Sequence, residues 1–207
     1  MPVVTISRQY GAGGSSVAAL VAEAIGTEVL DKKIIEQIAA KLSLEPSEVE
    51  EESERPRTMF ENLVRSFSSL EPGMGAGWTP PYPDPLFDPH KEIVALTEQL
   101  IREAANTGNA VIVGRGAGFV LKDLPSVFRV FLWAPKDVRL KALQARFGFS
   151  EADAARKMHE TDSNRAAYTR QLYGRNWTDP EGYDLTVNTA RVGYQATADM
   201  ILRAVKR

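Results

Sequence analysis

Residues 3–16 read VVTISRQYGAGGSS, an apolar run that leads into a glycine-rich turn. The pattern predicts a strand, then the turn, then a helix directly after it. Gly11, Gly13 and Gly14 can adopt positive φ and let main-chain N–H groups approach a ligand closely, while the helix that follows adds the positive end of its dipole. The ligand expected at this turn is a phosphate group.

The turn departs from both common nucleotide-binding patterns. The phosphate-binding pattern GxxxxGK[ST] requires glycine where this chain has Arg8 and lysine where it has Gly14, although Ser15 and Ser16 match its hydroxyl position. The dinucleotide pattern GxGxxG requires glycine or alanine where this chain has Ser16. Phosphate binding is the favoured interpretation, and an ordinary structural turn is the alternative.

Composition limits the class of protein. The chain has 207 residues, 43% hydrophobic and 25% charged, which is enough for one large α/β core with accessory segments. A net charge of −2 gives no general attraction to nucleic acid or to an anionic membrane, so an anion site has to be local. Cysteine is absent, which excludes disulfides, thiolate metal sites and a cysteine nucleophile. No signal peptide or membrane span is apparent, and the cytoplasm is the expected location.

Strand and helix patterns alternate along the chain. Apolar runs predict further strands at 28–30, 110–113, 127–133 and 183–187. Helical spacing of apolar residues predicts helices at 17–25, 34–42, 93–104, 136–147 and 194–205, the last of which buries Tyr194. This alternation predicts an α/β fold with a doubly wound, five-stranded parallel sheet. Its ligand crevice should lie beyond the carboxyl ends of the strands, where Arg8, Asp31 and Arg115 converge.

Two segments interrupt the alternation, so we expect one domain over 1–207, with a core of 1–44, 90–145 and 176–207. Residues 45–89 begin with an acidic run and end in a proline- and glycine-rich loop at 71–89, and they form the first insert. Residues 146–175 are locally basic and form the second, either a mobile lid over phosphates or a solvated helical hairpin.

The second insert holds the charged residues of most interest. Arg165 and Arg170 are five positions apart and could flank one anion. Asp162 is expected to cap a helix or stabilise a turn, and the alternative is that it orients Arg165. His90 and His159 are isolated, and we interpret both as structural or surface residues. Asp179 and Asp184 are expected to cap or stabilise turns.

Five segments together carry a family resemblance. They are ISRQYGAGGSSVA (6–18), LDKKII (30–35), VIVGRGAG (111–118), TDSNRAAY (161–168) and WTDPEGYDLTVNT (177–189). In this order and spacing, the chain resembles the cytidylate kinase-like branch of the nucleoside monophosphate kinases. The resemblance implies a P-loop NTPase fold with a helical nucleoside monophosphate-binding insert and a helical lid.

The resemblance also implies an activity: transfer of the ATP γ-phosphoryl group, with Mg²⁺, to CMP or dCMP. The ATP phosphates would be held by Gly11, Ala12, Gly13, Gly14, Ser15 and Ser16, with a hydroxyl of Ser15 or Ser16 facing the magnesium. The acceptor would be bound by Asp31, Lys32 and Arg115, and the catalytic arginines would be Arg8, Arg165 and Arg170. Small nucleotides are the implied partners, and homo-oligomerisation is left open.

Departures from the family pattern leave other functions open. Gly14 replaces the loop lysine, Gly116 replaces the aspartate of the family's Gly-Arg-Asp turn, and Lys32 and Gln37 replace acceptor-side residues. A missing lysine can be replaced only by another cation that reaches the same oxygens, for which Arg8 is the nearest candidate and Arg170 the next. One alternative is a nucleotide-binding protein without turnover, and another is a kinase for a different small acceptor.

Overall fold

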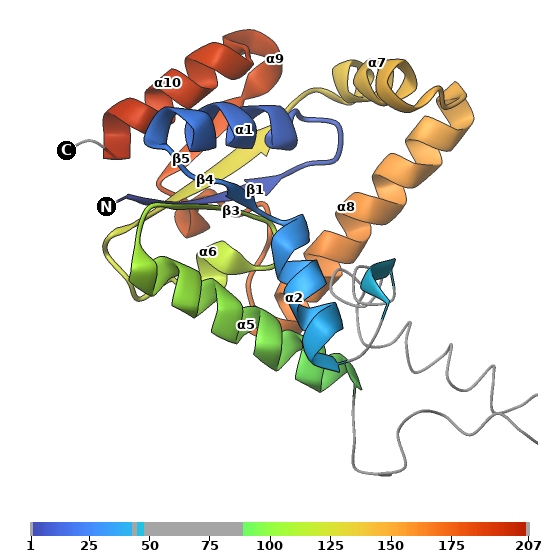
Figure 1. Ribbon diagram of the computed structural model, residues 1–207. Helices are drawn as coiled ribbons and strands as arrows, with labels where there is room; N and C mark the ends of the chain where they lie inside the picture. The colour runs from blue at the N-terminus through green and yellow to red at the C-terminus, as the bar shows by residue number, and fades with distance from the viewer. Residues whose placement is uncertain (1, 43–44, 48–88, 206–207) are drawn as a thin grey trace, which may run out of the picture.

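A five-stranded parallel sheet forms the centre of the molecule (Figure 1). The computed structural model describes residues 2–42, 45–47 and 89–205. The strands are β1 (Val3–Arg8), β2 (Val29–Leu30), β3 (Ala110–Val113), β4 (Val127–Trp133) and β5 (Leu185–Asn188), in the spatial order β2-β3-β1-β4-β5. The predicted fold class is therefore confirmed, and β1 lies in the middle of the sheet with the glycine-rich turn at its carboxyl end.

Helices cover both faces of the sheet. They are α1 (Gly14–Ile25), α2 (Lys32–Leu42), α5 (Pro89–Thr107), α6 (Ala117–Val120), α7 (Lys136–Phe147), α8 (Glu151–Tyr173), α9 (Thr189–Val192) and α10 (Tyr194–Val205), with a 3₁₀ turn, η1, at Pro180–Gly182. On one face α1 and α10 pack against the sheet, and on the other α2, α5 and α6 do so (Figure 1). Side chains of β1 point to the two faces in turn. Val3 packs in the core with α2, α5 and α6, whereas Val4 and Ile6 pack in the core with α1 and α10.

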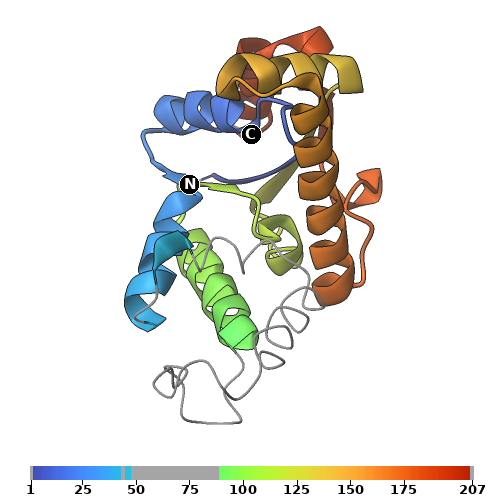
Figure 2. The ribbon, with the colours of Figure 1, turned by 90° about the vertical axis from the view of Figure 1, so that its right-hand side faces the viewer.

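The second insert is dominated by one long helix. Helix α8 runs along the edge of the molecule and α7 lies at one of its ends (Figure 2). Ser150 caps α8, since its side chain accepts a hydrogen bond from the Asp153 N–H, and Gly174 ends it in the left-handed conformation. The helical-hairpin interpretation of residues 146–175 is wrong, because residues 151–173 form a single helix.

The first predicted insert, 45–89, lies almost wholly outside the described residues, and so does most of the proline-rich loop at 71–89. Within the described ranges, none of the helices combines the length and the apolar character needed to cross a membrane.

Two aspartates expected at turns differ in their roles. Asp179 caps η1 as predicted, because its carboxylate accepts a hydrogen bond from the Glu181 N–H at 3.1 Å. Asp184 does more than stabilise a turn. Its carboxylate accepts hydrogen bonds from the main-chain N–H of Arg129 at 2.8 Å and from the Arg129 guanidinium at 2.9 and 3.1 Å. This pair fastens the start of β5 to β4.

We expect the Asp184–Arg129 pair to make stability depend on pH. Partial burial raises the pKa of Asp184, but the bonds from Arg129 outweigh it and leave the pKa below its ordinary value. A carboxylate with a lowered pKa stabilises the fold at neutral pH and loses this effect as the pH falls below about 4. Asp184→Asn should therefore lower the melting temperature at pH 7, and this difference should shrink at pH 3. An equal difference at both values would contradict an ionic origin.

Candidate active site

The glycine-rich turn presents the open end of a helix. Gly11 and Gly13 have φ of +82° and +80°, which only glycine adopts without strain, and Gly13 occupies the N-cap position of α1 without a side-chain cap. The first N–H groups of a helix have no partners within the helix, and the helix dipole adds positive potential there. This geometry suits an anion, as the sequence predicted.

A cavity of about 310 Å³ lies over this turn, and we call it the loop pocket. Its lining residues are Arg8, Gln9, Tyr10, Gly11, Gly13, Gly14, Ser15, Ser16, Ala142, Leu143, Arg146, Phe147, Arg165 and Tyr194. Of the predicted phosphate-binding residues, Ala12 is not in this lining: it is buried, and its carbonyl accepts a hydrogen bond from the Thr189 hydroxyl at 2.9 Å. Ala12 therefore contributes main-chain geometry to the turn.

The structure gives a physical reason for glycine at position 14. A Cβ atom on Gly14 would lie 2.6 Å from Cγ and 2.9 Å from Cβ of Arg8, too close for any real contact. The stem of Arg8 therefore crosses the loop directly over Gly14. A Cβ on Gly114, in the turn after β3, would meet the Arg8 guanidinium. Arg8 thus reaches from the glycine-rich loop to the second turn and fills the space in which a side chain at position 14 would begin.

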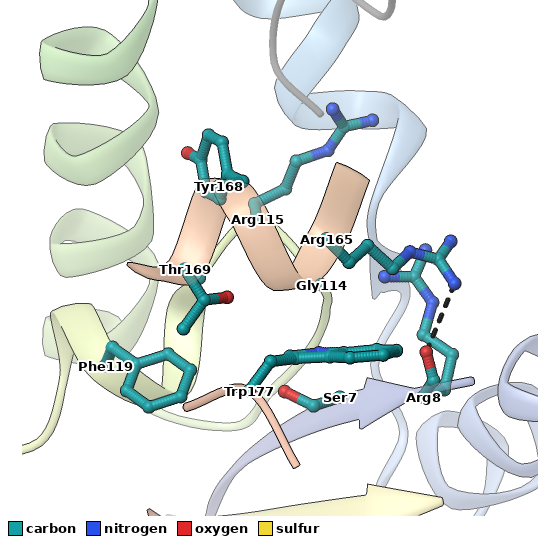
Figure 3. Close-up of a pocket in the computed structure, with 10 residues that line it drawn as sticks. Ser7, Arg8, Gly114, Arg115, Phe119, Arg165, Tyr168, Thr169 and Trp177 are labelled. Carbon is teal, nitrogen blue, oxygen red and sulfur yellow. Dashed lines mark hydrogen bonds between the residues drawn. The ribbon is translucent and has the colours of Figure 1, made fainter. Parts of the chain in front are cut away.

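A second, narrow pocket lies beside the first, and we call it the arginine pocket (Figure 3). Its lining residues are Ser7, Arg8, Gly114, Arg115, Gly116, Phe119, Arg165, Tyr168, Thr169 and Trp177. At its edge, the Asp31 carboxylate lies 3.7 Å from a guanidinium nitrogen of Arg8 and 3.7 Å from one of Arg115. The structure thus brings together Arg8, Asp31 and Arg115, as expected from their positions after three parallel strands.

Arg165 of α8 connects the two pockets. Its guanidinium donates a hydrogen bond to the main-chain carbonyl of Arg8 at 3.1 Å (Figure 3). Arg8 and Arg165 line both pockets, so two cations stand where the loop pocket meets the arginine pocket.

Other predicted residues lie elsewhere. Lys32 is the first residue of α2. Arg170 is exposed near the end of α8 and lines neither of the two pockets. The prediction that Tyr194 is buried is wrong: it is 39% exposed. Tyr194 opens α10, and its ring lies against Gly13 in the loop pocket instead of in the core.

Aromatic residues that form one side of the arginine pocket were missed as site residues. Trp177 lines the pocket and is buried against Phe131, with ring centroids 5.5 Å apart. The Tyr183 hydroxyl donates to the Trp177 carbonyl at 2.7 Å. Burial raises the pKa of Tyr183 to about 12, against the lowering effect of a hydrogen bond with Ser7, so the phenol stays protonated and able to donate. The sequence signal was that Trp177 is the first residue of the family segment at 177–189.

The glycine at position 116 also has a neighbour that fills its side-chain space. A Cβ there would lie 2.5 Å from the ring of Tyr173, the last residue of α8. That ring stacks on Phe119 with centroids 5.6 Å apart. An aspartate at position 116 would collide with Tyr173. The position of Tyr173 at the end of α8 therefore requires glycine at position 116, where the family pattern has aspartate.

Magnesium is the metal that the resemblance implies. Ser15 and Ser16 are exposed at the start of α1 and line the loop pocket, so their hydroxyl oxygens can face a bound cation. Mg²⁺ prefers oxygen ligands and is commonly bound through substrate phosphates with few protein groups. Among the described residues no cluster of three or more histidine, aspartate or glutamate side chains forms a separate metal site. The donor set fits a magnesium ion that arrives with a nucleotide.

Comparison with known proteins finds cytidylate kinases among the chains of similar sequence. The cytidylate kinase of Ignicoccus hospitalis is 32% identical over 112 residues, which are 54% of this chain and 64% of that enzyme. The chain therefore spans just under two thirds of the length of this relative.

Two solved structures share the fold. An uncharacterised protein from Eubacterium ventriosum superposes with a TM-score of 0.71 at 22% identity, covering 100% of this chain and 99% of that one. Shikimate kinase from Bacteroides thetaiotaomicron does so with a TM-score of 0.52 at 14% identity, with the same coverages. The sheet and its flanking helices are thus arranged as in these two proteins.

A family profile matches most of the chain. The profile described as the cytidylate kinase-like family covers residues 3–191, which includes the glycine-rich loop, the turn after β3 that carries Arg115, and the whole of α8. This chain belongs to the cytidylate kinase-like family.

Proposed function

We propose that this chain is a phosphotransferase that moves the γ-phosphoryl group of ATP, with Mg²⁺, to a nucleoside monophosphate, with CMP or dCMP as the first candidates. Family membership and the kinase fold support this function. The observation that carries it furthest is the position of Arg8 and Arg165, which line both the loop pocket and the arginine pocket. Cations placed between the donor and the acceptor phosphates would neutralise the charge that develops during phosphoryl transfer.

In this proposal the loop pocket binds ATP. The main-chain N–H groups at the start of α1 hold the phosphates, and the hydroxyls of Ser15 and Ser16 face the magnesium ion. When bound, the ion would supply positive charge to offset the negative charge that develops on the phosphates. Arg8 supplies the side-chain cation that the loop lacks at position 14, because its stem already lies over Gly14.

The arginine pocket receives the acceptor phosphate. Arg115 has a buried side chain, 3% exposed, and together with Arg8 it faces the Asp31 carboxylate. The pocket has a volume of only about 20 Å³, enough for about one water molecule. An acceptor phosphate therefore has to move the surrounding side chains, and it can take over the arginine contacts that Asp31 makes in the unliganded protein.

The chemical step needs little proton transfer. The attacking oxygen belongs to a phosphate that is already ionised, so no general base is required. It attacks the γ-phosphorus in line with the bond to the departing ADP oxygen. The protein contributes positioning and charge neutralisation by main-chain amides, Arg8 and Arg165.

A second candidate function is nucleotide binding without turnover, and two glycines favour it. Gly14 and Gly116 replace charged residues of the family pattern, and both are packed against other side chains. A chain that binds nucleotides without turnover would tolerate both changes. A kinase for another small acceptor is the remaining alternative, because Lys32 changes the acceptor side.

One assay separates these functions. ADP formation by the full chain is measured with ATP and Mg²⁺ against CMP, dCMP, UMP, AMP, GMP and shikimate, and binding of a non-hydrolysable ATP analogue is measured by calorimetry. We expect turnover with CMP or dCMP well above the rate without acceptor. Binding without turnover would support the regulatory alternative, and turnover only with another acceptor would change the substrate. Absence of both binding and turnover would refute the nucleotide-binding function.

A further inference from the structure

The side chain of Asp162 on α8 connects three parts of the molecule. One carboxylate oxygen accepts a hydrogen bond from the main-chain N–H of Tyr10 at 2.8 Å. The other accepts a hydrogen bond from the Arg139 guanidinium of α7 at 2.6 Å. The sequence suggested that Asp162 caps a helix or turn or else orients Arg165, and this is corrected by its place within α8 and by these contacts, which go to Tyr10 and Arg139.

Arg139 contacts the same main chain from the other side. Its guanidinium donates to the Tyr10 carbonyl at 3.2 Å and to the Ala134 carbonyl at 3.0 Å, and the residue is only 8% exposed. The N–H and the C=O of Tyr10 are therefore both held by one ion pair, largely shielded from water. Charge-assisted hydrogen bonds in such surroundings are stronger than neutral ones.

Tyr10 is the residue from which the glycine-rich turn departs. The next residue, Gly11, packs directly on α7: a Cβ there would lie 3.0 Å from the Arg139 carbonyl oxygen and 3.2 Å from Arg139 Cβ. A shift of Tyr10 would thus move the turn off α7. These contacts hold the start of the turn against α7.

The same face of α8 also carries Arg165, which lines both pockets. Asp162 and Arg165 are three residues apart, so they lie on one side of the helix. Asp162 binds the main chain at Tyr10, and Arg165 binds it at Arg8, at 3.1 Å. One helix face therefore holds the backbone at two points, on either side of Gln9.

We propose that Asp162 and Arg139 are positioning residues for phosphoryl transfer. They fix the glycine-rich turn in its anion-binding shape and seat α8 so that Arg165 lies beside Arg8. This role rests on the proposed function, but its first consequence, the shape of the unliganded turn, can be measured without any nucleotide. It differs from a general stabilising ion pair because the pair acts on the main chain of the turn.

The test compares Asp162→Asn and Asp162→Ala with Asp153→Asn. The amide of Asp162→Asn can still accept from Tyr10 N–H but loses its charge toward Arg139, whereas Asp162→Ala loses both contacts. Asp153 makes the matched control, since it forms an exposed ion pair with Arg156 on the same helix, at 3.1 Å. Main-chain N–H resonances of residues 10–16 are recorded in the unliganded proteins, and KM for ATP, kcat and the melting temperature are then determined.

We expect the resonances of residues 10–16 to shift in both Asp162 variants and to stay in place in Asp153→Asn. KM for ATP should rise about 10-fold in Asp162→Asn and about 100-fold in Asp162→Ala, because a misplaced binding group costs this much. Lower melting temperatures with unchanged turn resonances and unchanged KM would refute the positioning role. Shifted resonances in a chain that shows no turnover in any form would support the positioning role and refute the proposed activity.

Discussion

Arg8→Ala is expected to lower kcat about 100- to 1000-fold, the effect of removing one group that stabilises charge in a transition state. Arg8 is the cation whose stem covers Gly14, and its guanidinium lies against Gly114 where the two pockets meet. Steady-state ADP formation with the acceptor identified in the substrate panel provides the measurement. Arg156→Ala is the control, because Arg156 is exposed on α8 and forms a surface ion pair with Asp153.

A lysine introduced at position 14 tests directly whether Arg8 takes the place of the usual loop lysine. Gly14→Lys alone should reduce activity, because the new Cβ would collide with the stem of Arg8. In the double variant Arg8→Ala, Gly14→Lys the space is free, and the lysine can reach the phosphates as it does in the usual loop. We expect the double variant to be more active than either single variant. Wild-type turnover in Arg8→Ala would show that another group supplies the charge.

Arg165→Ala is expected to have the second large effect, a decrease in kcat of about 1000-fold, within the range known for arginines that stabilise transferring phosphoryl groups. Its guanidinium lines both pockets and binds the Arg8 carbonyl, so its loss removes charge from the transfer path. The same ADP assay measures it, again with Arg156→Ala as the control on the same helix.

Arg170→Ala then tests which of the two predicted arginines of α8, Arg165 or Arg170, acts in phosphoryl transfer. The sequence predicted both as catalytic, but Arg170 is exposed and outside the two pockets. A loss of kcat in Arg170→Ala as large as that in Arg165→Ala would contradict the assignment of the transfer path to Arg165.

Much of the sheet could be predicted from local patterns. Strands β3 and β4 and helix α7 have the predicted bounds, because their apolar runs and helical spacing end at glycines, prolines or polar turns. The meeting of Arg8, Asp31 and Arg115 followed from one rule, since each stands at the carboxyl end of a parallel strand. Short-range sequence signals were sufficient for these features.

Contacts between distant side chains could not be predicted in this way. The partners of Asp162 are 23 and 152 positions away, and no local pattern indicates them. Gly14 reads as a lost lysine until the stem of Arg8 is seen above it. Tyr194 fits the apolar spacing of α10, but it stands in the first turn of the helix, beyond the edge of the core.

The central claim is that a phosphate binds the main-chain N–H groups of residues 11–16 and that arginines from distant segments close around it. A crystal structure of the chain with Mg²⁺ and a non-hydrolysable ATP analogue tests this most directly. We predict phosphate oxygens within hydrogen-bond distance of those N–H groups, with Arg8 and Arg165 beside the γ-phosphate. A nucleotide bound elsewhere, with the loop pocket empty, would contradict the claim.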